Sequence, residues 1–126
     1  MRLDLVYLAV GAILGAFIRY FITGKSLFLD SVPVSVLIVN IVGSFILGVT
    51  MTGVRTLGFD QRYVLLVGVG FCGSLTTMSS FAFETVNLLD VGKLVLAGLD
   101  MVLNVGLSIL AIIAGQAVIN LISGLV

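Results

Sequence analysis

The sequence has no histidine and one cysteine, so the residues that build most transition-metal and redox sites are nearly missing. With Cys72 alone, no disulfide can form within the chain, and a set of His and Cys metal ligands is excluded. The sequence also shows no paired nucleophile and base and no phosphate-binding loop. We therefore expect that the protein is not an enzyme, and we interpret Cys72 as a small apolar packing residue.

Charged residues are scarce as well, at 10% of the 126 residues, and the six basic side chains balance six acidic ones. Soluble domains draw roughly a quarter of their residues from the charged types. Without an excess of basic residues, no nucleic-acid partner is expected. Apolar residues dominate instead, with 60% hydrophobic residues and a mean hydropathy of +1.34. Because a membrane-spanning helix needs about 20 apolar residues, the chain has room for about four spans in a lipid bilayer.

The apolar runs predict an all-α integral membrane protein with a single transmembrane domain over residues 1–126. Its four helices are expected at about 3–22, 32–54, 63–90 and 94–123. Pro33 would lie in the first turn of the second helix, where a missing N–H is harmless, and Asp30 or Ser31 would cap it. The first run continues into a full span without a cleavage-type exit, so we expect it to be retained.

Small residues within the apolar runs predict close helix packing. The spacings Gly11-x-x-x-Gly15 and Ser44-x-x-x-Gly48 allow two helices to approach closely. A chain this small can hardly enclose a pore alone, so a pore would require an oligomer.

Basic residues are balanced across the membrane. Four spans place three of them on each side, with Arg2, Arg55 and Arg62 opposite Arg19, Lys25 and Lys93. The positive-inside rule therefore gives no preferred orientation. Two interpretations remain open: another determinant sets the orientation, or the chain inserts both ways and forms an antiparallel dimer.

The third predicted helix carries glycines and hydroxyl residues around its centre, from Gly68 to Ser80. Glycine lowers helix stability, and Ser and Thr hydroxyls compete for backbone partners. The cluster predicts a helix that is broken at mid-membrane, where freed carbonyls can hold a cation and a new helix N-terminus attracts an anion. The alternative is an unbroken helix whose hydroxyls bond back by one turn.

Further polar residues lie at depth in the second and fourth helices. Asn40 and Ser44 share one helix face, and so do Asn104 and Ser108. Each pair could join helices or donate hydrogen bonds to an anion. No Lys or Arg lies near the centre of any predicted span, so an anion path would use neutral donors.

Three ionisable residues, Arg19, Glu84 and Asp100, enter the spans nearer an end than the centre. We expect them to be partly solvated at the membrane surface. This position argues against a proton-coupling carboxylate at mid-membrane.

With these residues in view, the chain resembles the Fluc (CrcB) family of prokaryotic fluoride channels over essentially its whole length. The resemblance rests on Gly15-Ala-Phe-Ile-Arg19-Tyr20, on Val39-Asn40-Ile-Val-Gly43, on Gly70-Phe-Cys-Gly73-Ser-Leu-Thr76-Thr77-Met78-Ser79-Ser80-Phe81 and on Glu84-Thr85. It implies a multi-pass protein of a prokaryotic cell membrane that exports fluoride passively and lowers fluoride toxicity. It also implies an antiparallel dual-topology homodimer with two fluoride pores. A central structural sodium ion would be held by the backbone carbonyls of Gly73 and Thr76 from both subunits.

The resemblance also implies a set of pathway residues. The fluoride path would be lined by Asn40, Met78, Ser79, Ser80, Phe81 and Ser108, with Arg19 and Glu84 in the vestibule. The family has two phenylalanines three residues apart; Phe81 matches the second, and Met78 replaces the first. A thioether lacks the positively polarised edge of an aromatic ring, so two-ring coordination of fluoride is in doubt here. Phe83 should point elsewhere on the helix.

Two other functions remain open at this stage. A proton-coupled small multidrug exporter needs an acidic residue at mid-membrane, usually in the first helix, which has none there. A non-transporting membrane assembly subunit would account for the small-residue packing, but not for the polar cluster near Phe81. The sequence also leaves open whether the dimer joins identical chains or two related ones.

Overall fold

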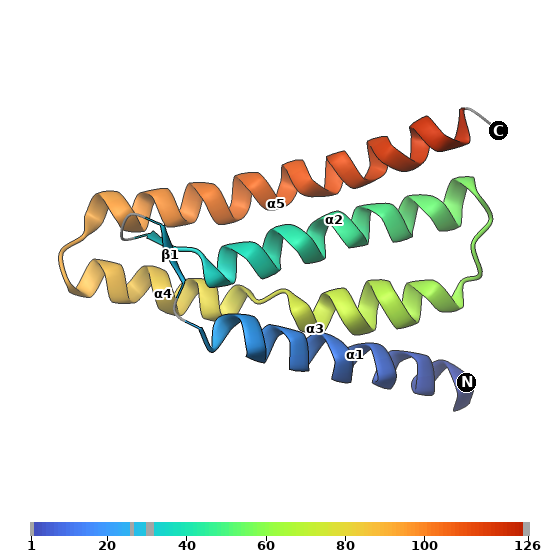
Figure 1. The fold of residues 1–126 in the computed structure, drawn as a ribbon, viewed down its shortest axis with the longest axis horizontal. Coiled ribbons are helices and arrows are strands. Elements are labelled where there is room, and N and C mark those ends of the chain that lie inside the picture. The colour runs from blue at the N-terminus through green and yellow to red at the C-terminus, as the bar shows by residue number, and fades with distance from the viewer. Residues whose placement is uncertain (1, 26, 30–31, 125–126) are drawn as a thin grey trace.

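The computed structural model describes residues 2–25, 27–29 and 32–124, and it consists of long helical segments that run side by side (Figure 1). In chain order they are α1 (Arg2–Thr23), α2 (Ser35–Thr56), a third segment and α5 (Leu94–Ser123). The third segment comprises the π-helix η1 (Val64–Cys72), α3 (Gly73–Leu75) and α4 (Met78–Asp90). Four stretches are long and apolar enough to cross a membrane: Leu3–Thr23, Ser35–Thr56, Val64–Asp90 and Leu94–Ser123. The prediction of an all-helical protein with four candidate spans is confirmed.

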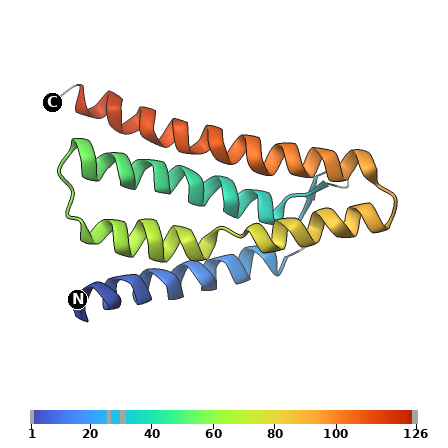
Figure 2. The same cartoon turned by 180° about the vertical axis from the view of Figure 1, so that it is seen from behind.

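The segments are arranged in the order α5, α2, third segment, α1, and the two chain ends lie at the same end of the bundle in both views (Figures 1 and 2). The main contacts join α2 to α5 and α1 to η1. Half of α2 is buried, whereas most of α1 and α5 faces outward. Large apolar side chains such as Phe17 and Leu110 are exposed on these outer helices. Such faces suit contact with lipid, where apolar surface costs nothing.

Glycines allow the close helix contacts. A Cβ on Gly11 would overlap the carbonyl of Leu66, and one on Gly15 would overlap the carbonyl of Phe71. Each glycine therefore lets α1 pack directly on the backbone of the third segment. These contacts confirm the close approach predicted for the small-residue spacing in the first helix.

The start of the second helix differs from the prediction. Pro33 does not lie in the first helical turn but in β2 (Val32–Pro33), which pairs antiparallel with β1 (Phe28–Leu29). This pairing keeps the chain extended through Pro33, so α2 begins only at Ser35. The predicted position of Pro33 is therefore wrong.

Ser35 closes the loop that precedes α2. Its hydroxyl accepts a hydrogen bond from the Leu27 N–H at 3.0 Å and donates one to the Lys25 carbonyl at 2.7 Å. The predicted caps, Asp30 and Ser31, lie outside the described residues.

Candidate functional site

The third segment is interrupted between α3 and α4 at Thr76 and Thr77. Both residues have extended backbones, with φ −74° and ψ 151° at Thr76 and φ −149° and ψ 109° at Thr77. Thr77 caps α4, because its Oγ1 accepts the Ser80 N–H at 3.2 Å. The Thr76 hydroxyl does bond back by one turn, to the Cys72 carbonyl at 2.9 Å. The helix nevertheless breaks here, so the alternative of an uninterrupted third helix is wrong.

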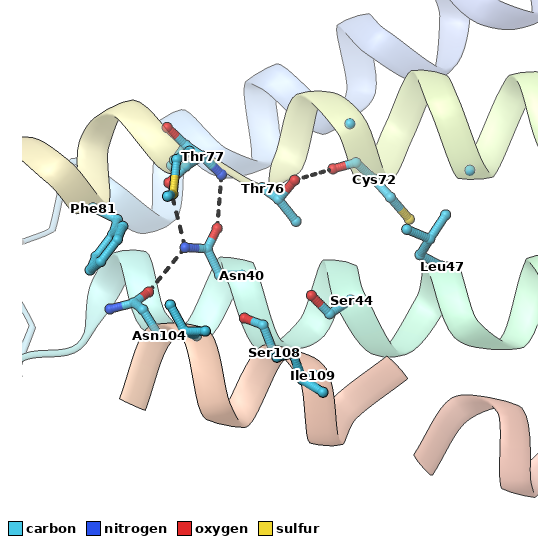
Figure 3. Close-up of a pocket in the computed structure, with 14 residues that line it drawn as sticks. Asn40, Ser44, Leu47, Cys72, Thr76, Thr77, Phe81, Asn104, Ser108 and Ile109 are labelled. Carbon is cyan, nitrogen blue, oxygen red and sulfur yellow. Dashed lines mark hydrogen bonds between the residues drawn. The ribbon is translucent and has the colours of Figure 1, made fainter. Parts of the chain in front are cut away.

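The side-chain amide of Asn40, on α2, holds this break (Figure 3). Its Oδ1 accepts the Thr77 N–H at 2.8 Å, and its Nδ2 donates to the Thr77 carbonyl at 3.4 Å. The same Nδ2 donates to Asn104 Oδ1 on α5 at 3.0 Å. One amide thus satisfies the backbone of Thr77 and joins the break to α2 and α5.

Two backbone carbonyls lose their usual helical donors at the break. In a continuous helix the Thr77 N–H would bond to the Gly73 carbonyl, and the Ser80 N–H to the Thr76 carbonyl. Here the Thr77 N–H is donated to Asn40 and the Ser80 N–H to Thr77 Oγ1. Gly73 is also exposed, and a Cβ placed on it would meet no neighbouring atom within 4 Å. These two carbonyls can therefore serve another ligand.

A cavity of about 390 Å³ lies beside the break, between α2, the third segment and α5. Figure 3 shows polar side chains from all three pointing toward this space. Four of the residues predicted for the fluoride path line it, together with the hydroxyl residue Ser44 and the amide residue Asn104; the four are Asn40, Met78, Phe81 and Ser108.

Phe81 and Met78 contribute to the cavity wall in different ways. Phe81 is 7% exposed, whereas Met78 is 71% exposed. The ring of Phe81 is therefore fixed by surrounding protein. The thioether of Met78, at the first position of α4, has little protein around it within one chain.

The polar groups of the cavity differ in whether their hydrogens are already used. Nδ2 of Asn40 donates within the protein, and Nδ2 of Asn104 donates to the carbonyl and Oδ1 of Asp100, at 3.2 and 2.8 Å. In contrast, the Ser108 hydroxyl is buried and has no hydrogen-bond partner among the described residues. The asparagine donors are thus used within the protein, and the Ser108 hydroxyl is a buried donor that remains available to a ligand.

Other predicted site residues lie elsewhere. Ser79, Ser80 and Glu84 line a separate pocket of about 370 Å³, which also includes Thr23 at the end of α1. Glu84 Oε2 is buried and has no hydrogen-bond partner in the described part of the chain. Arg19 lines neither this pocket nor the main cavity.

Asp100 is the polar residue whose position sequence analysis missed. We expected it to be partly solvated, but it is 1% exposed and lies between α4 and α5. Its Oδ2 accepts from Thr85 Oγ1 at 2.6 Å, and its Oδ1 accepts from Asn104 Nδ2 at 2.8 Å. The expectation of solvation is wrong because neighbouring side chains satisfy the carboxyl group. The i, i+4 spacing of Asp100, Asn104 and Ser108 is the signal that could have placed it in this network.

The sequence is similar to known proteins along nearly its whole length. It is 47% identical over 120 residues to the fluoride-specific ion channel FluC of Nitrosopumilus maritimus, with 95% of each chain covered. It is 45% identical over 112 residues to the FluC of Sulfurihydrogenibium sp., covering 86% of this chain and 90% of that one. For the FluC of Shewanella amazonensis the identity is 37% over 118 residues, covering 92% and 95%. Residues 6–116 match the family of CrcB-like proteins (camphor resistance), and the chain therefore belongs to this family.

Proposed function

We propose that the protein is a fluoride-selective channel, not an enzyme, that lets fluoride leave the cell passively and so lowers its toxicity. Relatives that cover most of the chain carry the name fluoride-specific ion channel. One observation carries this function to the present chain. The cavity at the break has no basic residue in its lining, yet it holds the buried Ser108 hydroxyl, which has no partner among the described residues.

Such a cavity can select a small anion with neutral groups alone. An anion gives up its water only where protein groups replace that water. The Ser108 hydroxyl and the ring edge of Phe81 present positive polarity to the cavity. The N-terminus of α4 adds the partial positive charge of its first turn. Because these donors are few and the walls are apolar, a larger anion would gain less from them than fluoride does.

The second pocket supports an extension of the pathway. Ser79, Ser80 and Glu84 all lie on α4 and line this pocket. Glu84 is further along the helix from the break than Phe81 is. We assign these residues, with Arg19 near the end of α1, to the outer part of the fluoride route.

A structural sodium ion fits the carbonyls of Gly73 and Thr76. Both have lost their helical donors, and backbone oxygens suit a hard cation. No group of three or more His, Cys, Asp or Glu side chains in the described residues could hold a metal ion. One chain supplies two oxygens, too few for such a cation, and Gly73 faces open space. A second copy of the chain would complete the site.

The same second copy accounts for the balanced basic residues. An antiparallel homodimer requires that the chain insert in both orientations, which a three-against-three balance permits. The break lies in the middle of the Val64–Asp90 stretch, and this supports a position near mid-membrane. We therefore propose a dual-topology homodimer in a prokaryotic cell membrane, with two fluoride pores per dimer.

A proton-coupled exporter is the second candidate, because the carboxyl group of Asp100 is buried. A carboxyl group that couples proton and substrate movement must reach the substrate path. Asp100 is not among the residues that line the cavity, and both of its carboxyl oxygens accept hydrogen bonds from protein. These contacts favour the passive channel.

Ion efflux from liposomes tests the proposal. Vesicles that contain purified protein, fluoride and chloride are given a potassium ionophore, and ion-selective electrodes follow both anions. We expect fluoride to leave and chloride to stay, at a rate that a protonophore does not change. Retention of fluoride, release of chloride or a drug cation, or dependence on a proton gradient would each overturn the assignment.

A further inference from the structure

We infer that Asp100 is a positioning residue that fixes the break in the third segment by acting through Asn104 and Asn40. The inference rests on the proposed function, because fluoride flux is one of its readouts. It assigns a role to Asp100, whose buried carboxyl group does not line the cavity.

Asp100 is held by hydrogen bonds and not by an ion pair. With 1% of its surface exposed, it cannot be solvated, and a polar group buried without partners is costly. Thr85 of α4 donates to its Oδ2 at 2.6 Å, and Asn104 donates to its Oδ1 at 2.8 Å. Within the described residues, no basic side chain pairs with it. Toward Asn104, its Oδ1 acts as an acceptor.

The hydrogen bonds that connect Asp100 to the break run in one direction. A backbone N–H can only donate, so Asn40 must turn its Oδ1 toward the Thr77 N–H, at 2.8 Å. This places Asn40 Nδ2 against Asn104, whose Oδ1 accepts at 3.0 Å. Asn104 must then turn its Nδ2 the other way, toward an acceptor. Asp100 supplies two acceptors, its Oδ1 at 2.8 Å and its own carbonyl at 3.2 Å.

An acceptor at this position matters because an asparagine amide has nearly the same shape either way round, so its partners decide its orientation. Oδ1 and the backbone carbonyl of Asp100 both accept from Asn104 Nδ2, with Oδ1 the closer of the two, and they favour this one orientation of the amide. If Asn104 turned over, its Nδ2 would face Nδ2 of Asn40, with two donors in contact. Asn40 would have to turn over in response and would withdraw its Oδ1 from the Thr77 N–H. The Thr77 N–H at the break would then lose its hydrogen bond to Asn40.

Asp100 is also connected through Thr85 to α4, the helix that carries Phe81. The Thr85 hydroxyl lies 2.6 Å from Asp100 Oδ2 and 3.0 Å from the carbonyl of Phe81. Asp100 is thus linked both to the break and to the turn of α4 that carries Phe81. Since Asp100 does not itself line the cavity, any effect on ion selection must pass through these neighbours.

Two substitutions separate the acceptor role from simple packing. Asp100→Leu introduces an apolar side chain of similar length and removes the carboxyl acceptors. It leaves Asn104 only the longer contact, to the backbone carbonyl of residue 100 at 3.2 Å. Asp100→Asn keeps an oxygen for Asn104 and can turn its Nδ2 toward the Thr85 hydroxyl, which also accepts. We expect Asp100→Leu to lower fluoride efflux about tenfold or more, since a hydrogen bond of this kind is lost, and to weaken the preference for fluoride over chloride. Asp100→Asn should retain both properties.

A double-mutant cycle tests whether Asp100 acts through Asn104. Asn104→Leu should reproduce the loss seen in Asp100→Leu, and the double variant should be no worse than either single one, because both break one chain of contacts. Losses that multiply in the double variant would overturn the inference. Thr50→Ala serves as the control, since its hydroxyl donates only to the Ile46 carbonyl of its own helix, at 2.8 Å.

A second readout does not depend on conduction. In isotope-labelled protein, the side-chain amide resonances of Asn40 and Asn104 should be single and sharp in the wild type and in Asp100→Asn. In a folded Asp100→Leu variant, they should shift or broaden as the amides turn over. Unchanged resonances in Asp100→Leu would overturn the positioning role, whether or not the wild type conducts fluoride. A wild type that does not conduct fluoride would refute the proposed function and leave this test of the positioning role valid. If Asp100→Leu does not fold, Asn104→Leu tests the same link, and wild-type flux and selectivity in it would refute the inference.

Discussion

Phe81 and Met78 lie on adjacent turns at the start of α4, and only one of them is held in place by the chain itself. Phe81 is 7% exposed, and its backbone carbonyl lies 3.0 Å from the Thr85 hydroxyl. Met78 is 71% exposed. A ring edge that is fixed in the cavity wall can present its positive polarity to an anion, whereas a thioether has no such edge. The aromatic contribution to the pathway therefore comes from Phe81.

We predict that Phe81→Ile lowers fluoride flux about tenfold or more, because it keeps apolar bulk but removes the polarised ring edge. Met78→Phe should be tolerated, since it adds a ring at an exposed position. Fluoride efflux from liposomes measures both effects, with size-exclusion chromatography as the check on assembly. Normal flux in Phe81→Ile together with an inactive Met78→Ala would show that bulk, and not ring polarity, is what the pathway needs.

The Ser108 hydroxyl permits a second test at this scale. It is buried and has no partner in the described residues, so Ser108→Ala should leave the thermal stability unchanged or slightly raised. Fluoride flux should nevertheless fall several-fold, because a neutral donor is worth about 1 kcal/mol. Thr50→Ala, which removes a hydroxyl bonded within its own helix, should leave flux unchanged. Equal flux in the two variants would refute a role for Ser108 in the pathway.

Sequence analysis could place these side chains on helix faces but could not assign their partners. The i, i+4 spacing of Asn40 with Ser44, and of Asn104 with Ser108, predicted shared faces, and all four residues line one cavity. Whether an amide faces an ion or another helix depends on which faces meet across the bundle, and spacing within one helix does not contain that information. For the same reason the burial of Asp100 was not predicted.

In the third segment, the residue pattern predicted that the helix is broken but not what causes the break. The glycine and hydroxyl cluster predicted a break, but not every glycine in it serves that purpose. A Cβ on Gly70 would meet the Leu8 carbonyl of α1 at 2.6 Å, so Gly70 allows close packing. The break is stabilised by two hydrogen bonds that replace helical ones: the Ser80 N–H to the Thr77 hydroxyl, and the Thr77 N–H to Asn40 Oδ1. The π-helical form of η1 was not predicted either, because its apolar pattern does not distinguish it from an α-helix.

The contact between α1 and η1 gives a prediction for this scale. Gly11→Ala should lower the free energy of unfolding by about 1–3 kcal/mol, since the new methyl group overlaps the Leu66 carbonyl and the helices must separate. Gly98→Ala is the matched control, because a Cβ there meets nothing within 4 Å and alanine favours the helix. Thermal unfolding in detergent, followed by helix content, compares the two. A Gly98→Ala variant less stable than Gly11→Ala would contradict the packing interpretation.

As a whole molecule, one chain leaves residues exposed on both sides of the break. Gly73 and Met78, on either side of the break, are both exposed. The carbonyls of Gly73 and Thr76 have lost their helical donors, and in the proposed sodium site they would supply two oxygens where a hard cation needs several more. A second copy that packs on this face would cover the exposed residues and supply the missing oxygens, so assembly and the cation site would depend on each other.

Gly73→Val tests this dependence, because the monomer has room for the new side chain but an interface would not. A Cβ at Gly73 meets nothing within 4 Å in the single chain, so helix content should match that of the wild type. We expect the variant to elute as a monomer and to lose fluoride flux. An ion that binds only the folded protein raises its thermal stability, so sodium should stabilise the wild type but not this variant. Gly98→Val, at a glycine with equal space around it, should remain a dimer. A dimeric, sodium-stabilised Gly73→Val protein would place the interface and the cation elsewhere, while a monomeric wild type that conducts fluoride would refute the dimer itself.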